Sequence, residues 1–189
     1  MATSISTPLS EATIRALKVG DEVLISGLIY TGRDAVHKHL YSGGNCPVDL
    51  NGQIIYHCGP VMLGKEGHYR VAGAGPTTSI REEPYQAAII EKFGLRGVIG
   101  KGGMGAATAE ACRKFGCAYL HAVGGAAQVY ARTITAVKGV YLKEEFGSPE
   151  AIWVFEVKDF PVVVTIDAQG NNLHKDLSES TLQTLLGKL

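Results

Sequence analysis

Two glycine-rich loops in the middle of the chain carry the side chains best suited to binding an anion. Residues 75–81 (GPTTSIR) contain hydroxyl groups and the guanidinium of Arg81, and residues 100–105 (GKGGMG) contain the ammonium group of Lys101. Each loop leads into a predicted helix, and the unpaired N–H groups at a helix N-terminus favour anions. With Arg81 and Lys101 added, the pattern predicts a site for a small dianion.

The second loop also matches two nucleotide-binding motifs in part. Its GxGxxG pattern is the dinucleotide fingerprint, which requires an acidic residue about 20 positions later, at the end of the next strand. The next predicted strand, residues 118–123, is followed by Gly-Gly-Ala with no acid. The Walker motif requires Ser or Thr after its lysine, whereas Lys101 is followed by glycine. Tight turns alone would also explain the glycines, but two loops that each hold a cation favour a binding site.

A succession of helices and strands must position these loops. Helical spacing of apolar residues, ended in two places by glycine, predicts helices over residues 9–17, 35–41, 83–93, 106–115, 125–132 and 173–186. Runs rich in β-branched and aromatic residues predict strands over residues 23–30, 53–58, 68–74, 95–99, 118–123, 134–142, 152–157 and 161–166. Because strand, helix and strand alternate in the middle of the chain, we expect parallel pairing there.

These elements predict one α/β domain over residues 1–189, with a mixed sheet and flanking helices. Residues 1–8 are expected to be a loose tail, and residues 158–160 a turn between the last two strands. The C-terminal helix is expected to turn an apolar face to the core, formed by Leu177, Leu182, Leu185 and Leu186.

Composition excludes several classes of partner. The chain has 18 basic and 18 acidic side chains and no basic stripe, which argues against nucleic acid and anionic membranes as partners. It has neither a signal-peptide pattern nor an apolar run near the roughly 20 residues of a membrane span, so we expect a cytoplasmic protein. It has 24 glycines among 189 residues, a larger share than the average of about 7%, which suits a scaffold rich in loops.

The four cysteines do not form a metal-binding pattern. Cys46, Cys58, Cys112 and Cys117 show no CxxC spacing and lie in apolar or loop surroundings. We expect them to be reduced thiols, buried as small hydrophobic side chains.

Six motifs together resemble the β subunit, or C-terminal domain, of the class I iron–sulfur hydro-lyases. That family comprises the class I fumarases and the L(+)-tartrate dehydratases. The resemblance covers residues 8–178 in the family's order, and the motifs are TGRDAVHK (31–38), NG (51–52), HCGP (57–60), GPTTSIR (75–81), GKGGMG (100–105) and DAQGNNL (167–173). The two anion loops, taken together, are its most specific part.

The resemblance implies reversible hydration of a double bond in a C4 dicarboxylate. It implies a [4Fe–4S] cluster held by three cysteines of an α partner, with none bound by this chain alone, which agrees with the cysteine pattern. The complete active site would then form only in a heterodimer or heterotetramer with the α subunit, and the isolated chain would be inactive. Self-association of the isolated chain as a homodimer is compatible with this picture. The family's fold is a swivelling β/β/α domain.

The family's functional residues match particular positions of this chain. Arg33 and Arg81 match its carboxylate-binding arginines, and Lys101, next to Gly102, matches the lysine of the same site. Thr77 matches the threonine proposed to take the proton from C3 of malate. Because a threonine hydroxyl is a weak base at neutral pH, Thr77 would need an activating neighbour, or would only hydrogen-bond a substrate carboxylate.

Further residues of these motifs have a second explanation. Asp34 is expected to orient Arg33, while His37 and Lys38 either support the site or simply cap and solvate their helix. Arg33 could instead form a local ion pair with Asp34, and Arg81 could pair with Glu82 or Glu83. Asn171 and Asn172 are expected to shape their loop.

Three functions follow from the resemblance. Gly32 before Arg33 favours the fumarase form, since tartrate dehydratases of the family tend to carry cysteine there. L(+)-tartrate dehydratase β is the second hypothesis. A non-catalytic dicarboxylate-binding domain is the third, although such a domain would have no need of a hydroxyl at Thr77.

Overall fold

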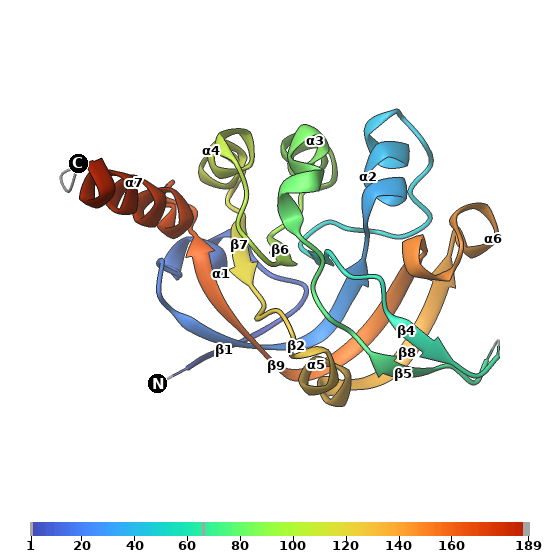
Figure 1. Cartoon of the computed structure of the whole chain (residues 1–189). Helices are drawn as coiled ribbons and strands as arrows, with labels where there is room; N and C mark the ends of the chain where they lie inside the picture. The colour runs from blue at the N-terminus through green and yellow to red at the C-terminus, as the bar shows by residue number, and fades with distance from the viewer. Residues whose placement is uncertain (1, 66, 187–189) are drawn as a thin grey trace.

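Five strands close into a barrel-like sheet at the centre of the computed structural model, which describes residues 2–65 and 67–186 (Figure 1). Parallel pairs join the first four strands in the order β2, β3, β6 and β7, and β9 closes the ring by pairing antiparallel with both β7 and β2. The bounds are β2 (Glu22–Thr31), β3 (Ile54–Tyr56), β6 (Gly97–Gly100), β7 (Ala118–His121) and β9 (Ile152–Ile166).

Two further strands extend this barrel-like sheet, and two more lie apart from it. β1 (Thr3–Ser6) adds to β2 in parallel, and β8 (Ile134–Tyr141) adds to β9 antiparallel. β4 (Val61–Leu63) and β5 (Arg70–Gly73) form a separate two-stranded ribbon. The expected mixed α/β fold with flanking helices is confirmed.

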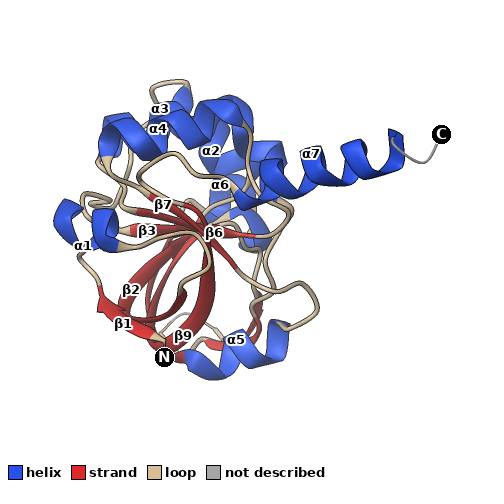
Figure 2. Ribbon diagram, turned by 90° about the vertical axis from the view of Figure 1, so that its left-hand side faces the viewer, coloured by secondary structure: helices blue, strands red, loops and turns tan. Residues whose placement is uncertain are grey.

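Helices cover the sheet unequally. α2 (Asp34–Tyr41), α3 (Glu83–Phe93) and α4 (Ala106–Phe115) lie side by side on one face, and α5 (Ala127–Thr133) lies on the opposite side of the molecule (Figures 1 and 2). The remaining helical segments are α1 (Glu11–Ala16), α6 (Lys143–Phe146), α7 (Leu173–Leu186) and the 3-10 turns η1 (Ser79–Glu82) and η2 (Ser148–Glu150). Of the helices in the described ranges, none has the length and apolar character needed to cross a lipid bilayer.

Strand alternation divides the core into two buried clusters. Neighbouring residues of a strand face opposite sides, so Tyr56 and Phe155 join the cluster inside the barrel, whereas Ile55 and Val154 join the cluster under α2, α3 and α4. Cys112 and Cys117 belong to this second cluster. All four cysteines are free thiols, as expected, and three of them are buried, whereas Cys46 is only half-buried.

The middle of the chain follows the sequence prediction closely. β3, β6 and β7 pair in parallel, as expected from their alternation with helices. α3 ends at Gly94 and α4 at Gly116, and both glycines adopt left-handed backbone conformations that other residues enter at a cost.

The predicted turn at residues 158–160 is wrong. β9 runs unbroken through this stretch, because β2 pairs with it on both sides of the expected turn. Ile25 pairs with Phe160 and Gly27 with Val157, so β9 carries one more residue than β2 between these pairs. The polar stretch is therefore a β-bulge, with Asp159 at φ 53°.

The predicted loose tail over residues 1–8 is also wrong, since Thr3–Ser6 forms a strand beside β2. Its short, mostly polar sequence gives little strand signal, and pairing with β2 decides its conformation. The expected single domain over residues 1–189 includes residues 1, 66 and 187–189, which lie outside the described residues.

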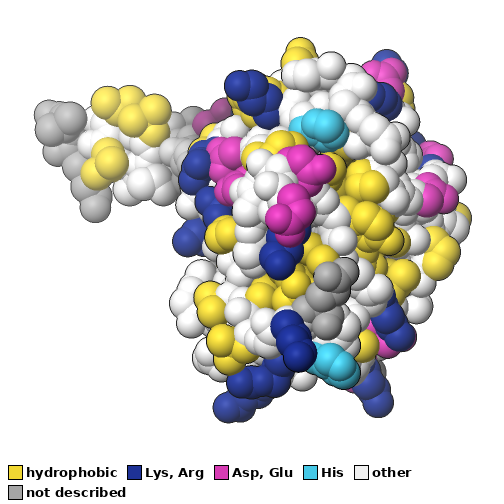
Figure 3. Space-filling view, turned by 90° about the vertical axis from the view of Figure 1, so that its right-hand side faces the viewer, with side chains coloured by type: hydrophobic (Ala, Val, Ile, Leu, Met, Phe, Trp, Pro, Cys, Tyr) yellow, Lys and Arg dark blue, Asp and Glu magenta, His cyan; other side chains and the backbone are white. Residues whose placement is uncertain are grey.

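The predicted core face of the C-terminal helix is wrong as well. α7 projects from the body of the molecule, and hydrophobic side chains lie on the surface of the projecting segment (Figures 2 and 3). The four leucines expected to be buried are 57–62% exposed: Leu177, Leu182, Leu185 and Leu186. Helical spacing marks an apolar face but does not show whether the same chain covers it.

Candidate functional site

The predicted site residues gather at one edge of the barrel-like sheet. Carboxyl ends of parallel strands meet at the same edge, where ligands bind in many α/β folds. Arg33 follows β2, His57 follows β3 and Lys101 follows β6. The loop of residues 75–81 lies across these ends, because Thr77 N–H donates to the His57 carbonyl at 2.6 Å and Ser79 N–H donates to the Lys101 carbonyl at 3.0 Å. Backbone pairing therefore brings both anion loops together.

Arg33 is held by a carboxylate from a distant part of the chain. Its Nε lies 3.2 Å from Glu150 Oε1, whereas its Nη2 lies 3.9 Å from Asp34 Oδ2. A Cβ added at Gly59 would lie 2.6 Å from Arg33 Nη1, so the guanidinium rests directly on this glycine. The ion pair with Asp34 is thus the weaker of the two contacts, and Glu150 orients the side chain.

Arg81 pairs with Asp34 rather than with its neighbours in sequence. Its Nη2 lies 2.8 Å from Asp34 Oδ2, and the arginine side chain is half exposed. The alternative pairing with Glu82 or Glu83 is therefore wrong. Asp34 lies between the two guanidinium groups, which are the groups that match carboxylates best.

Lys101 lies beside a second glycine-rich turn. A Cβ added at Gly124 would meet its Cδ at 3.4 Å and its Nζ at 3.9 Å, which places the lysine stem along this turn. Gly102, the next residue, is exposed and has φ 81°, a left-handed conformation that suits glycine. The loop therefore reverses immediately after Lys101 and leaves its half-buried side chain at the strand ends.

Thr77 is fixed through its backbone. Its N–H donates to His57 and its carbonyl accepts from Lys101 N–H at 3.3 Å. Over residues 2–65 and 67–186, the structure shows no hydrogen bond to the Thr77 hydroxyl, which is half-buried. The chain thus holds the backbone of Thr77 in place, and we expect any group that activates its hydroxyl to come from elsewhere.

The N-terminus of α4 is not open to an external anion. The Glu83 carboxylate accepts hydrogen bonds from Gly105 N–H at 2.8 Å, Ala107 N–H at 3.0 Å and the Thr108 hydroxyl at 2.6 Å. The expectation that this helix start binds a ligand is therefore wrong, because the protein's own carboxylate fills it. Glu83 instead ties the second anion loop to α3.

A layer of buried polar side chains lies under these loops. The side-chain amide of Gln86 bridges two histidines, lying 3.0 Å from His37 Nε2 and 2.9 Å from His57 Nε2. His57 Nδ1 lies 2.9 Å from the Ser79 hydroxyl, which also accepts from the Tyr119 hydroxyl at 2.9 Å. Burial lowers the pKa of both histidines, so both rings are neutral at pH 7.

Glu82 is a buried carboxyl next to this layer. Its Oε2 lies 3.8 Å from His37 Nδ1, and neither oxygen has a hydrogen-bond partner among the described residues. Burial raises its pKa to about 7; Asp34 and Glu150 add to this rise, while the positive charges of Arg81 and Arg33 oppose it. The remaining predicted support residue, Lys38, is exposed on α2.

Sequence reasoning missed Glu150 and Gln86, and it named Ser79 and Glu82 only as members of the first loop and as a partner of Arg81, without their buried positions. Glu150 approaches Arg33 only in the folded chain, more than 100 residues away in sequence. Gln86 has a detectable signal, because it is a polar residue close to a helix start and among apolar positions of α3.

The cysteines do not suit an iron–sulfur cluster. Cluster ligands are thiolates, whereas burial raises the pKa of Cys58 to about 12. A hydrogen bond with Cys117, together with burial, raises the pKa of Cys112 well above its ordinary value. Within the described part of the chain, no three His, Cys, Asp or Glu side chains are placed to hold a metal ion.

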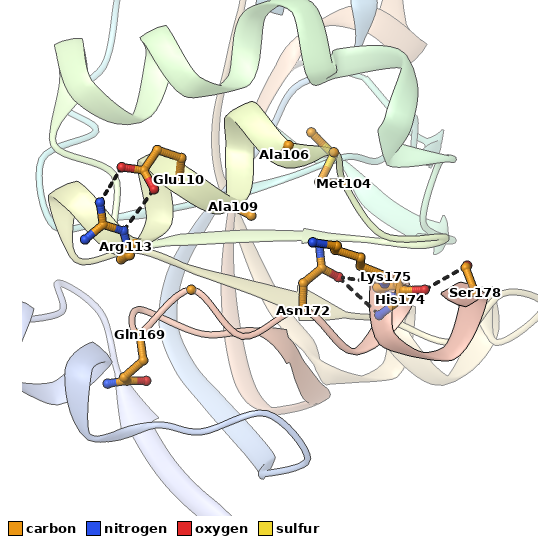
Figure 4. Close-up of a pocket in the computed structure, with 12 residues that line it drawn as sticks. Met104, Ala106, Ala109, Glu110, Arg113, Gln169, Asn172, His174, Lys175 and Ser178 are labelled. Atoms are coloured by element: carbon orange, nitrogen blue, oxygen red, sulfur yellow. Dashed lines mark hydrogen bonds and ion pairs between the residues drawn. The ribbon is translucent and has the colours of Figure 1, made fainter. Parts of the chain in front are cut away.

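A cavity of about 600 Å³ lies between α4 and the start of α7 (Figure 4). It touches the second anion loop at Met104 and Gly105, but Arg33, Thr77, Arg81 and Lys101 do not line it.

The two asparagines of the polar loop hold the chain at the start of α7. The Asn172 side chain accepts a hydrogen bond from His174 N–H at 3.1 Å, and Asn171 Nδ2 donates to Asp167 at 2.8 Å. The expected loop-shaping role of both asparagines is confirmed.

Comparison with known proteins gives consistent matches. The family model described as Fumarase C-terminus matches residues 2–177. A protein of Geobacillus stearothermophilus, provisionally named fumarate hydratase class I, is 60% identical over 183 residues, which are 96% of this chain and 35% of that protein. The chain thus spans about a third of that relative's length.

Two shorter relatives match over most of their own length. The L(+)-tartrate dehydratase subunit β of Escherichia coli K12 is 37% identical over 89% of this chain and 85% of its own. A protein of Methanocaldococcus jannaschii, provisionally named L(+)-tartrate dehydratase subunit β, is 36% identical over 94% of this chain and 93% of its own.

Proposed function

This chain belongs to the Fumarase C-terminus family, and from that premise we propose that it is the β subunit of an iron–sulfur-dependent fumarate hydratase. In this role it supplies carboxylate-binding residues for the reversible hydration of fumarate to L-malate. The site is completed by a cluster-bearing α subunit, in a heterodimer or heterotetramer. The 60% identity to a relative named for this activity supports the choice.

The observation that carries the proposal is the arrangement of Arg33, Asp34 and Arg81. The guanidinium groups of Arg33 and Arg81 both lie close to the carboxylate of Asp34. Lys101 and Thr77 lie at the same edge of the sheet. A C4 dicarboxylate presents two carboxylates and so matches two arginines. Asp34 occupies Arg81 when no substrate is present, and a substrate carboxylate takes its place.

The chain's own residues then hold the substrate but do not complete the reaction. Arg33 and Arg81 bind the two carboxylates, and Lys101 adds positive charge. Thr77 either takes the proton from C3 of malate or hydrogen-bonds a carboxylate. Because the buried thiols here do not fit a [4Fe–4S] cluster, we assign the cluster to the α partner. The isolated chain is then inactive.

L(+)-tartrate dehydratase β is the second candidate. The observation that favours it is length, since this chain covers 85% and 93% of two relatives named as β subunits of that enzyme. A Cβ added at Gly32 would meet Ile55 at 2.8 Å and Val36 at 3.2 Å, so a larger residue there would have to displace core side chains next to Arg33.

The test is anaerobic co-expression of this chain with its candidate α partner, followed by assays of fumarate and L-tartrate in parallel. Consumption of fumarate that needs both chains and an intact cluster establishes the hydratase. Consumption of tartrate alone moves the assignment to the second candidate. If the chains do not associate, a non-catalytic dicarboxylate-binding domain becomes the better description.

The finer expectations of the family belong to the same proposal. They are a swivelling β/β/α domain, a cytoplasmic location and self-association of the isolated chain as a homodimer. Sedimentation of the isolated chain and of the co-expressed complex tests the last of these.

A further inference from the structure

The buried polar layer touches the site at three separate points. His37 Nδ1 lies 2.9 Å from the Arg33 carbonyl, the His57 carbonyl accepts from Thr77 N–H, and Ser79 N–H donates to the Lys101 carbonyl. Each of these contacts fixes the backbone of a residue that carries a predicted site side chain.

Gln86 joins these three points. Its side-chain amide is fully buried and lies within 3.0 Å of Nε2 of both histidines. His57 continues the chain through Nδ1 to the Ser79 hydroxyl. The two imidazole rings also pack edge to face, with centroids 4.9 Å apart. One amide thus connects Arg33, Thr77 and Lys101 through two rings and one hydroxyl.

The positions of the protons in this layer follow from its donors and acceptors. The Arg33 carbonyl can only accept, so His37 must carry its proton on Nδ1. In a neutral ring Nε2 is then an acceptor, and the atom of Gln86 that faces it must donate. A half-turn of the side-chain amide about its terminal C–C bond puts the NH₂ group between the rings, where its two hydrogens serve both Nε2 atoms.

The opposite orientation of the amide is unfavourable. With Oε1 between the rings, the neutral His37 ring would face two acceptors, the Arg33 carbonyl and Gln86 Oε1, with only one proton. A buried acceptor that faces another acceptor in this way costs about 1–3 kcal/mol. Charging His37 would remove the conflict, but burial lowers its pKa and opposes the charged form.

We propose that Gln86 is a positioning residue of the dicarboxylate site. Its NH₂ group holds His37 and His57 as Nδ1–H tautomers, and those Nδ1–H groups donate to the Arg33 carbonyl and the Ser79 hydroxyl. This inference rests on the proposed function for its catalytic consequence, but the tautomers themselves are a property of the chain alone.

The first test reads the tautomers directly in the isolated chain by ¹⁵N NMR of labelled histidines. We expect both rings to be neutral Nδ1–H forms at pH 7 in the parent chain. Gln86→Met removes the donor and should release this tautomer at His57, while the Arg33 carbonyl still favours Nδ1–H in His37. Gln169→Met, which removes an exposed side-chain hydrogen bond to the Arg15 carbonyl, should leave both rings unchanged. Nε2–H forms in the parent chain would overturn the proposal.

Gln86→Glu separates hydrogen bonding from packing, because the side chain keeps its shape but only accepts. It should switch His57 to Nε2–H, add a proton to Nε2 of His37 while its Nδ1–H stays on the Arg33 carbonyl, and raise the pKa of both rings, which Gln86→Met should not do. The backbone amide signals of Thr77 and Lys101 should shift in both Gln86 variants and not in Gln169→Met. If these signals do not move, Gln86 does not position the site.

The second test uses the complex with the α partner. Gln86→Met should raise KM for the dicarboxylate by about tenfold, about 1.4 kcal/mol, with a smaller change in kcat. An unchanged KM in an active complex would overturn the positioning role. If no dicarboxylate is turned over by the parent complex, the proposed function fails, while the NMR results still decide the role of Gln86.

Discussion

Glu150 Oε1 lies 3.2 Å from Arg33 Nε, while its Oε2 accepts from Ala35 N–H at 3.0 Å. One carboxylate therefore orients the arginine and caps the first turn of α2. The Nε edge of the guanidinium is occupied, which leaves the Nη groups for a ligand. η2 and α2 are thus part of one anion-binding unit although they are distant in sequence.

Replacing Glu150 should weaken substrate binding more than folding. Glu150→Ala releases the Arg33 guanidinium, so we expect KM to rise about tenfold in the complex with the α partner, because the arginine loses the carboxylate that lies 3.2 Å from its Nε. Glu145→Ala, on exposed α6, is the matched control. Equal KM values for the two variants would show that Glu150 does not orient Arg33.

Two glycine substitutions should have different effects at the site. In Gly59→Ala, the new Cβ would lie 2.6 Å from Arg33 Nη1 and 2.9 Å from the Pro149 carbonyl, so both the arginine and η2 must shift. In Gly124→Ala, the new Cβ would meet the Lys101 stem at 3.4 Å, an ordinary contact. We expect KM to rise about tenfold in the first variant and to change less than about twofold in the second.

A similar KM in both variants would contradict the placement of Arg33 on Gly59. Thermal unfolding of the two proteins provides the control for folding. Gly59 lies in a loop outside the core clusters, so its substitution should leave most of the unfolding free energy intact.

The sequence predicts the middle of this fold well because local and tertiary signals agree there. Gly94 and Gly116 end their helices in left-handed conformations, and the apolar runs that follow them become buried parallel strands. The sequence predicts a turn at the bulge around Asp159, because polar residues are typical of turns and of β-bulges alike. Only the pairing of β9 with β2 distinguishes the two structures.

In the candidate site, too, the sequence predicts some features and tertiary contacts decide the others. Arg33, Thr77, Arg81 and Lys101 are recognisable from their motifs, and the strand order explains why they meet. Their partners are not recognisable, because Glu83 and Glu150 reach the site through helix packing and hydrogen bonds that no local pattern encodes. The N-terminus of α4 does attract a carboxylate, as its dipole predicts, but that carboxylate belongs to Glu83.

The Glu83 cap should stabilise the fold. Glu83→Ala removes the acceptor for backbone N–H groups at the start of α4 and for the Thr108 hydroxyl, and we expect a loss of about 2 kcal/mol in the free energy of unfolding. Denaturant unfolding measures it. Glu91 is an exposed residue of α3, the helix that Glu83 begins, and Glu91→Ala should lower the free energy of unfolding by less than about 0.5 kcal/mol. Equal losses would show that the cap contributes nothing.

The leucines of α7 should contribute little to the stability of the isolated chain. Leu182 is 57% exposed and Leu120 is fully buried in the barrel. We expect Leu182→Ala to cost less than about 0.5 kcal/mol and Leu120→Ala about 2–5 kcal/mol. A large loss for Leu182→Ala would mean that α7 packs against the chain or against a second copy, and sedimentation would distinguish the two.

Glu82 should make the fold less stable as the pH rises. Its pKa is raised from 4.5 to about 7 in the folded chain, so between these values the folded state binds more protons than the unfolded state. Stability from this group is complete below pH 4.5 and is lost as the pH rises through 7. Burial is the main cause of the raised pKa, to which Asp34 and Glu150 add and which Arg81 and Arg33 oppose. His37 also faces this carboxyl, with Nδ1 3.8 Å from Oε2.

Glu82→Gln removes this charge without changing the shape of the side chain. The free energy of unfolding of the variant should exceed that of the parent by roughly 2–3 kcal/mol at pH 8 and should nearly equal it at pH 4. Measuring both proteins at both pH values separates the charge effect from packing. A variant that is less stable than the parent at pH 8 would show that the Glu82 carboxylate is stabilised in the folded state, through a partner such as a charged His37.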